Sequence, residues 1–213
     1  MPRRALPVCV ALALIALVCG ASAAASKLSK KASALPFVPQ PGDVLLQALD
    51  GDLSRLIAGI TGSPITHTGV VEERGGELYV LEAVGPVMRT PLRLWVKRGH
   101  GRYAVLRPQG ALAAAIPAFL DAARARLGTP YDVLFEWDDA KLYCSELVYK
   151  AAESAAGVSL GARERLGDMN WRPYETEIRR IAGGELPLDR LIYTPVALTH
   201  SPYLATVYWG FER

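Results

Sequence analysis

Cys144 is the residue best placed to do chemistry. It lies in the segment Leu142-Tyr143-Cys144-Ser145-Glu146-Leu147-Val148, and apolar residues continue at helical spacing as far as Ala155. This pattern predicts a helix that begins near Cys144. The N-terminus of a helix carries partial positive charge, which favours the nucleophilic thiolate over the thiol. The alternative is a small, buried and inert cysteine at the edge of the apolar helix face.

A cysteine nucleophile needs a base, and the chain has three histidines. His100 lies in a glycine-flanked loop and His200 lies near the C-terminus beside Pro202, so both are typical of surface histidines. His67 begins an apolar strand and has a candidate partner in Glu82. A carboxylate that binds one imidazole nitrogen leaves the other free to take the thiol proton.

The spacing of two strands brings His67 and Glu82 together. Residues 67–71 and 78–84 flank Arg74-Gly75-Gly76, which is typical of a β-hairpin. If residues 73–76 form the loop, His67 is directly opposite Glu82. Opposed residues point to the same face of the sheet, with Cβ atoms about 4.5–5.5 Å apart. A register error of one residue would place Glu82 on the other face.

Further elements must position these residues. Strands are predicted at 44–46 and 103–107, and helices at 53–60, 111–127 and 144–156. Residues 86–98 are expected to form another strand or an arm. Beyond Gly157 the chain is expected to be irregular, with one strand near 191–194. The predicted fold class is α+β, a small antiparallel sheet or half-barrel with helices packed on it.

The N-terminus indicates export. Arg3 and Arg4, an apolar run over 8–18 and small residues up to Ala23 are typical of a secretory signal peptide, predicted as residues 1–23. The apolar run is shorter than the roughly 20 residues of a membrane span. A lipoprotein anchor at Cys19 is disfavoured because Val18 is larger than the residue expected before such a cysteine. The protein is expected to be periplasmic or secreted.

Cleavage leaves Cys144 as the single cysteine of the mature chain. Such a cysteine is either reactive or buried and inert. Residues 24–40, rich in Ala, Ser, Lys and Pro, are predicted to be a flexible linker, and residues 41–213 a single domain.

Composition excludes several classes of protein. A chain of 213 residues with 51% hydrophobic residues is not disordered, and three cysteines are too few for a disulfide scaffold. A net charge of +3 disfavours a strongly basic nucleic-acid binder. No zinc spacing and no phosphate-binding glycine loop occurs, so no metal and no cofactor is predicted.

Five segments together resemble the circularly permuted papain-like amidases of the NlpC/p60 superfamily, of the YiiX/YebB type. They are residues 41–46, 63–71, 81–83, 128–132 and 143–148. The resemblance covers roughly residues 41–205. It implies that the histidine, acidic residue and cysteine of that group fall on His67, Glu82 and Cys144, and its upstream tyrosine on Tyr131.

The residues around this trio are candidates for binding substrate or the oxyanion. They are Tyr131, Thr66 and Ser145, together with the backbone N–H of Cys144 at the start of its helix. The structural alternative for Tyr131 is a partly buried side chain that closes the turn after Gly128.

The sequence thus predicts an exported cysteine hydrolase that cleaves amide bonds, of a peptide or a related acyl compound, through a thioester acyl-enzyme. Cell-envelope peptides are the first substrate class. A lipid acyltransferase or lipid amide or ester hydrolase is the second, and a wide apolar groove beside Cys144 would favour it. A non-catalytic binding module is the third. No nucleic-acid partner is expected, association with the envelope or a membrane surface is allowed by the linker lysines, and the oligomeric state is left open.

Overall fold

The computed structural model describes residues 35–212. Within the described residues, the chain from Pro39 onward forms one compact unit. The predicted signal peptide (1–23) and most of the predicted linker (24–40) lie outside the described residues. None of the helices within 35–212 has both the length and the apolar character needed to cross a bilayer.

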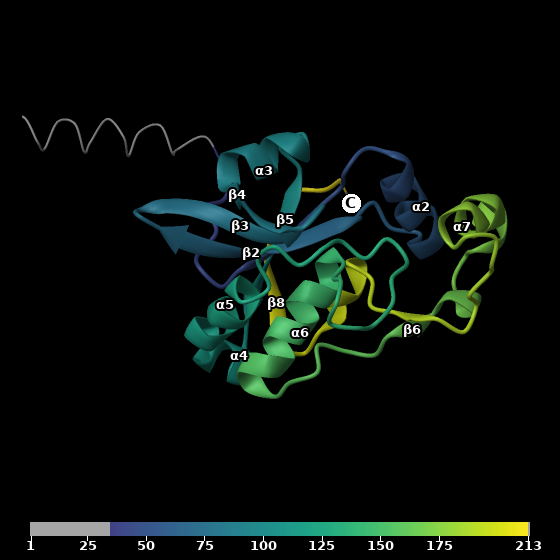
Figure 1. Cartoon of the computed structure of the whole chain (residues 1–213). Coiled ribbons are helices and arrows are strands. Elements are labelled where there is room, and N and C mark those ends of the chain that lie inside the picture. Colours follow the sequence, from purple (N-terminus) through teal and green to yellow (C-terminus); the bar gives the residue numbers. More distant parts are fainter. Residues whose placement is uncertain (1–34, 213) are drawn as a thin grey trace, which may run out of the picture. The chain divides into compact units, whose positions relative to one another are not determined.

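A six-stranded antiparallel sheet forms the centre of the unit, in the order β4-β3-β2-β1-β5-β8 (Figure 1). Its strands are β1 (Val44–Gln47), β2 (His67–Arg74), β3 (Glu77–Ala83), β4 (Val87–Pro91), β5 (Tyr103–Pro108) and β8 (Leu204–Trp209). A separate two-stranded sheet joins β6 (Glu164–Arg165) to β7 (Leu191–Ile192). The α+β class and the antiparallel sheet were predicted correctly.

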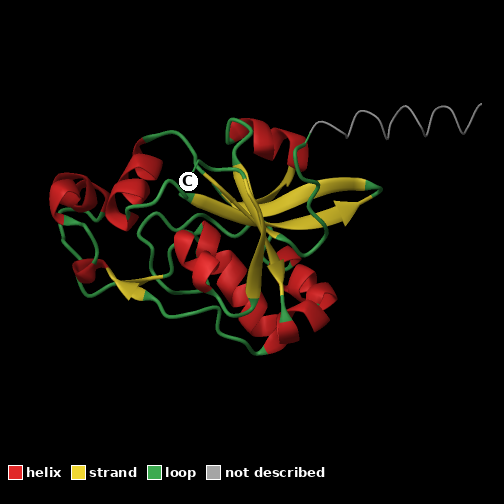
Figure 2. Ribbon diagram, turned by 180° about the vertical axis from the view of Figure 1, so that it is seen from behind, coloured by secondary structure: helices red, strands yellow, loops and turns green. Residues whose placement is uncertain are grey.

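Helices cover both faces of the sheet (Figure 2). One face packs on α4 (Gly110–Ala114), α5 (Ile116–Arg124) and α6 (Cys144–Ala156), while α3 (Leu92–Arg98) lies on the other. The remaining helices are α2 (Asp52–Thr61), α7 (Glu175–Ile181) and three short 3-10 turns, at Leu166–Asp168, Arg172–Tyr174 and Val196–His200. Val70 of β2 and Leu81 of β3 belong to the main core with residues of α5 and α6.

Three expectations for the elements need correction. The helix predicted over 111–127 is two helices, α4 and α5, and Pro117 stands in the first turn of the second. Proline has no N–H and clashes with the preceding turn, so it begins a helix rather than continuing one. The segment 86–98 is a strand followed by a helix, β4 and α3. The region after Gly157 contains α7 and the edge strand β8.

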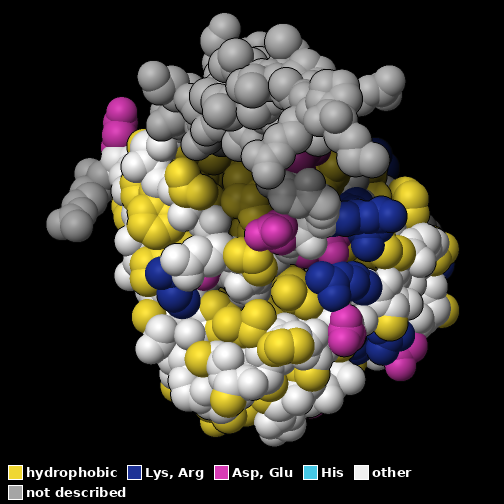
Figure 3. Space-filling model, turned by 90° about the vertical axis from the view of Figure 1, so that its left-hand side faces the viewer, with side chains coloured by type: hydrophobic (Ala, Val, Ile, Leu, Met, Phe, Trp, Pro, Cys, Tyr) yellow, Lys and Arg dark blue, Asp and Glu magenta, His cyan; other side chains and the backbone are white. Residues whose placement is uncertain are grey.

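The coloured side chains in Figure 3 show the surface on one side of the unit. Lys and Arg are interspersed there with Asp and Glu, and hydrophobic side chains are scattered among polar ones. This distribution matches the nearly balanced charge of the chain.

Candidate active site

Cys144 is the first residue of α6 and is buried. The helix ends at Gly157, which adopts the left-handed conformation, so the bounds 144–156 were predicted correctly. Within its first turn the Glu146 carboxylate accepts the Tyr143 N–H at 3.3 Å. The N–H groups of Cys144 and Ser145 point along the helix axis with no intrahelical acceptor, because the first turn of any helix lacks one.

His67 and Glu82 form a buried pair. The Nε2–H of His67 donates to Oε2 of Glu82 at 2.5 Å. Cys144 lies close enough to the imidazole to raise the pKa of His67. His67 is the first residue of β2, so it stands at the end of the sheet, and one ring there reaches both partners. The structure therefore brings the three predicted residues together.

The predicted register of the hairpin was wrong by two residues. Val70 pairs with Leu81 and Arg74 with Glu77, which places Gly69, not His67, opposite Glu82. The loop is the two-residue turn Gly75-Gly76, both residues having positive φ, rather than residues 73–76. A shift of two residues keeps each side chain on its face. His67 and Glu82 are therefore diagonal neighbours that meet across Gly69.

Glu82 is held by residues that the sequence did not indicate. The hydroxyl of Thr90 in β4 donates to Oε1 at 2.6 Å. The indole of Trp95 in α3 donates to Oε2 at 3.0 Å, and the guanidinium of Arg98 forms an ion pair with the same oxygen. The apolar spacing Leu92, Trp95, Val96 after Pro91 was the available signal for this helix.

The electrostatics of the pair follow from these contacts. Burial alone would lower the pKa of His67, but the hydrogen bonds and charges of Cys144 and Glu82 outweigh it and raise the pKa to about 9. Burial alone would raise the pKa of Glu82, but His67 and Arg98 lower it to about 2. At neutral pH, His67 is therefore a cation between two groups that stabilise it.

Tyr131 packs against the apolar cluster that contains Leu142 and Leu147, on either side of Cys144 in the chain. The residue is half-buried and pairs in a β-bridge with Leu142, two residues before Cys144. Burial raises the pKa of Tyr131 well above its usual value, and the charge of Cys144 adds to the effect. The phenol therefore remains a hydrogen-bond donor at any physiological pH.

Thr66 and Ser145 each have a backbone partner. The hydroxyl oxygen of Thr66 accepts the Leu49 N–H at 2.9 Å, and the hydroxyl of Ser145 donates to the Tyr193 carbonyl at 2.6 Å. Both side chains are buried. These contacts give each hydroxyl a structural use, and a role for either in binding substrate stays a prediction.

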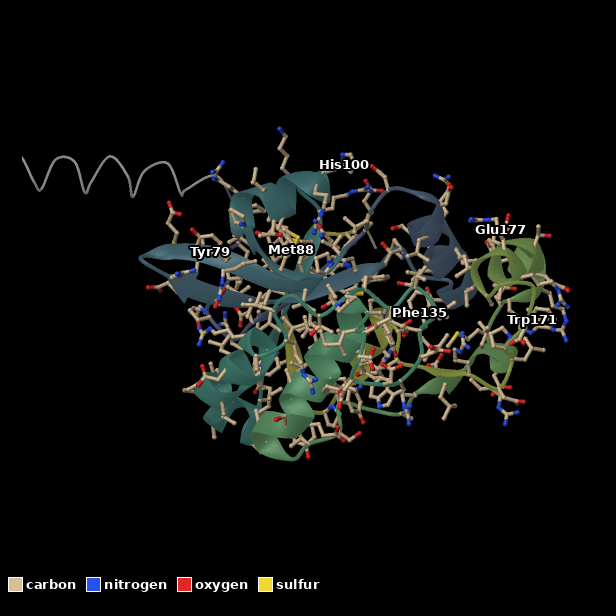
Figure 4. All side chains as sticks on the ribbon, in the orientation of Figure 1. Tyr79, Met88, His100, Phe135, Trp171 and Glu177 are labelled. Atoms are coloured by element: carbon tan, nitrogen blue, oxygen red, sulfur yellow. The ribbon has the colours of Figure 1, made fainter. Side chains whose placement is uncertain are left out.

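His100 and His200 lie apart from the trio. His100 pairs with exposed Asp50 at 2.7 Å, and Figure 4 shows it beyond α3. His200 ends a 3-10 turn before β8. Both positions fit the predicted surface histidines.

The chain matches a known protein family over most of its length. The model of the permuted papain-like amidase enzymes, the YaeF/YiiX, C92 family, matches residues 38–208. The chain belongs to this family. The family assignment predicted from five short segments is thus confirmed, and so is the permuted papain-like fold.

Two relatives within the family extend over most of the chain. The uncharacterized protein YiiX of Escherichia coli strain K12 is 35% identical over 178 residues, which are 82% of this chain and 88% of YiiX. The crystal structure described as metalloprotein yiiX from Escherichia coli O157:H7 has a TM-score of 0.77 and 33% identity. That match covers 83% of this chain and all of the other.

Membership shows the type of enzyme. The family is one of papain-like cysteine amidases and peptidases, so the chain is a cysteine hydrolase of the amidase type. The observed order of the site, histidine before cysteine along the chain, is consistent with a permuted papain-like arrangement.

Proposed function

We propose that this protein cleaves amide bonds by covalent catalysis, with Cys144 as nucleophile, His67 as general acid and base, and Glu82 as the carboxylate that orients His67. The observation that carries the proposal is the buried imidazole of His67, which donates a hydrogen bond to Glu82 and lies close enough to Cys144 for the cysteine to raise its pKa. This is the arrangement that activated nucleophiles require.

The reaction runs through a thioester. His67 holds the proton of the thiol, and the sulfur of Cys144 attacks the substrate carbonyl carbon. As the C–N bond breaks, His67 gives its proton to the leaving amine, and the acyl group remains on the sulfur. Water then loses a proton to His67 and attacks the thioester carbonyl. The C–S bond breaks, which releases a carboxylic acid and restores the thiolate with protonated His67.

The developing oxyanion has two candidate donors. The backbone N–H of Cys144 lies in the first turn of α6, where the amides lack helical acceptors and the helix dipole favours negative charge. The phenol of Tyr131 is the second, since its raised pKa keeps it protonated and the charge of Cys144 contributes to that shift. Preorganised donors of this kind stabilise the tetrahedral intermediate.

The donor set does not suit a metal centre. The yiiX protein from Escherichia coli O157:H7 is described as a metalloprotein. Among residues 35–212 of this chain, no group of three His, Cys, Asp or Glu side chains could hold a metal ion, and this includes His67, Glu82 and Cys144. The carboxylate of Glu82 is occupied by Thr90, Trp95 and Arg98 as well as His67. No step of the reaction is therefore assigned to a metal.

Export and an envelope substrate complete the proposal. They rest on the signal-peptide pattern of residues 1–23 and on the lysine-rich linker that follows. A lipid amide or ester is the second candidate substrate, and one observation favours it: the pocket that opens beside Cys144 has apolar walls.

Alkylation of Cys144 by iodoacetamide tests the catalytic pair. The rate is measured from pH 5 to pH 10 by intact mass on the mature chain, from residue 24, in which Cys144 is the single cysteine. The wild type, His67→Ala and Cys144→Ser are compared. Because His67 stays protonated to about pH 9, we expect fast labelling of the wild type already at pH 6.5. His67→Ala should be at least about tenfold slower there, and should approach the wild type above the pH of about 8.5 at which a free thiol ionises.

The controls separate reactivity from access. Cys144→Ser should not be labelled, which assigns the modified residue. A closed site would slow labelling at every pH without changing the shape of the profile. Identical profiles for the wild type and His67→Ala would contradict the proposed pair.

A further inference from the structure

The carboxylate of Glu82 binds two cationic side chains at one oxygen. Its Oε2 accepts the Nε2–H of His67 at 2.5 Å and also forms the ion pair with the guanidinium of Arg98. The other two donors are neutral: Trp95 donates to Oε2 at 3.0 Å, and Thr90 donates to Oε1 at 2.6 Å. Of these four partners, Arg98 is the one whose charge does not depend on pH in the range of the reaction.

Arg98 also differs from the other partners in its access to water. Glu82 and Trp95 are fully buried, and His67 is nearly so. The side chain of Arg98 is 33% exposed. Arg98 is the last residue of α3, and this helix packs over β3 and β4 (Figure 1). The buried pair of His67 and Glu82 is therefore linked to the solvent through this guanidinium.

The charged groups that act on His67 come from three elements. They are Cys144 of α6, Glu82 of β3 and, through Glu82, Arg98 of α3. The phenol of Tyr131 stays protonated and neutral. When Cys144 carries an acyl group it has no charge, so Glu82 and Arg98 are the charged groups that remain. The second half of the reaction is therefore where an effect of Arg98 is most clearly measured.

A buried carboxylate with no second cation would hold an imidazolium too firmly for catalysis. The attraction between the two charges is strong in the low dielectric of the interior. A general acid and base must nevertheless give up its proton and take it back within each turnover. A cation on the same carboxylate oxygen repels the imidazolium and weakens this attraction, while the hydrogen bond that orients the ring is kept.

We propose that Arg98 is a positioning residue of the hydrolase, which neutralises part of the charge of Glu82 so that His67 stays oriented but can release its proton. This rests on the proposed function, in which His67 is the acid and base. The reaction itself is unchanged: His67 protonates the leaving nitrogen as the C–N bond breaks, and later takes a proton from the water that cleaves the thioester. Arg98 acts on both transfers through Glu82.

A second buried carboxylate supplies a matched control. Glu72 of β2 forms ion pairs with Arg89 of β4 and, at 2.7 Å, with Arg124 of α5. The side chain of Arg89 is 26% exposed, which is close to the value for Arg98. Neither partner of Glu72 is a histidine. Substitution of Arg89 therefore removes a comparable ion pair without changing the partners of Glu82.

Hydrolysis of an acetyl-enzyme tests the proposal. The mature chain is treated with p-nitrophenyl acetate and desalted, and loss of the acetyl group from Cys144 is followed by intact mass from pH 5.5 to pH 10. Because His67 must be neutral to accept a proton from water, the rate should rise with pH to a plateau. The midpoint of that rise reports the titration of His67. Cys144→Ser corrects for acetylation elsewhere, and His67→Ala gives the rate without the base.

Arg98→Gln removes the charge but keeps a hydrogen-bond donor. We expect its midpoint to lie about one pH unit above that of the wild type, because a charge within about 4–6 Å has an effect of this size. Below the midpoint, its deacylation is then about tenfold slower than that of the wild type. Arg98→Lys keeps the charge and should restore most of the wild-type profile. Arg89→Gln should have the wild-type midpoint.

Folding of each variant is checked by thermal melts. Arg98→Met is the second neutral variant if Arg98→Gln does not fold. If neither neutral variant folds while Arg98→Lys does, Arg98 is a structural residue and the assignment is wrong. A lower plateau with an unshifted midpoint in Arg98→Gln has the same meaning, because loss of structure alone reduces the rate at every pH.

The outcomes separate this proposal from the proposed function. A profile that depends on His67 but has the same midpoint in the wild type and Arg98→Gln would overturn the role of Arg98 and leave the proposed function standing. If p-nitrophenyl acetate does not acylate Cys144, or if the acetyl group leaves as fast in His67→Ala as in the wild type, the proposed function fails, and the role of Arg98 fails with it.

Discussion

Glu82 and Glu146 are two fully buried carboxylates within the same unit, and their surroundings give them opposite properties. Burial raises the pKa of Glu146 to about 7, although Lys150 forms an ion pair with it at 2.8 Å. At Glu82 the hydrogen bonds and charges of His67 and Arg98 overcome burial. Between about pH 2 and pH 9, Glu82 is therefore charged while His67 is protonated, which is what an orienting carboxylate requires.

The stability of the folded protein should depend on pH because folding raises the pKa of His67. The pKa of His67 is raised from 6.5 to about 9 by folding, so its contribution is full below pH 6.5 and is lost as the pH rises toward 9. We expect the difference in Tm between the wild type and His67→Gln to be larger at pH 6 than at pH 9.5. Thermal melts monitored by circular dichroism measure it.

Measuring the effect of His67→Gln on Tm in a Cys144→Ser background separates the contribution of Cys144 from that of Glu82. Since Cys144 and Glu82 both raise the pKa of His67, the dependence on pH should keep its sign but become weaker. A Tm difference that grows from pH 6 to pH 9.5 would contradict the charged state assigned to His67.

At the scale of elements, the site depends on a close approach between β2 and β3. Gly69 is directly opposite Glu82, and a Cβ at this position would lie 2.5 Å from Val80 Cγ1 and 2.7 Å from the Leu81 carbonyl oxygen. It would also lie 3.1 Å from the Cβ of Glu82. The missing side chain is what allows the diagonal contact of His67 with Glu82.

Gly69→Ala should therefore disturb both stability and chemistry. Overpacking of this kind typically costs about 1–3 kcal/mol, and the displaced Glu82 should slow alkylation of Cys144 at pH 6.5 at least about fivefold. Gly85→Ala is the matched control, because a Cβ there meets nothing within 4 Å. Equal Tm values and equal labelling rates for the two variants would refute this account of Gly69.

Prediction from sequence succeeded where a local pattern determines the element. The apolar spacing and Gly157 define α6, and strand alternation places His67 and Glu82 on one face even with the wrong register. It failed at α3, because a short helix directly after a strand has a weak periodic signal. Trp95 and Arg98 were missed for that reason: their role depends on how α3 packs over the sheet, which no spacing along the chain records.

At the scale of the whole molecule, distant segments are joined around α6. The segment that contains Tyr193 is bound at both backbone groups, since Tyr193 N–H donates to the Tyr143 hydroxyl and its carbonyl accepts from Ser145. The ring centroids of Tyr193 and Tyr149 lie 4.9 Å apart. These contacts hold one wall of the pocket that opens beside Cys144. They were beyond sequence reasoning because 48 residues separate Ser145 from Tyr193.

Ser145→Ala tests this connection. It leaves the buried Tyr193 carbonyl without its side-chain donor, which should cost about 1–3 kcal/mol in the free energy of unfolding. Urea denaturation of the variant and the wild type measures the difference. A loss below about 0.5 kcal/mol would show that the bond does not hold the segment.

The parts of the site are unevenly spread along the chain. His67 lies 15 residues from Glu82, and Glu82 lies 16 from Arg98, so closing these loops costs little entropy during folding. Cys144 comes much later and meets His67 only when α6 docks on the sheet. His67 and Glu82 can thus come together within the hairpin and the helix that follows it, before Cys144 joins them. An unfolded chain carries an ordinary thiol, so under the proposed function the onset of fast alkylation at low pH should coincide with the completion of native packing.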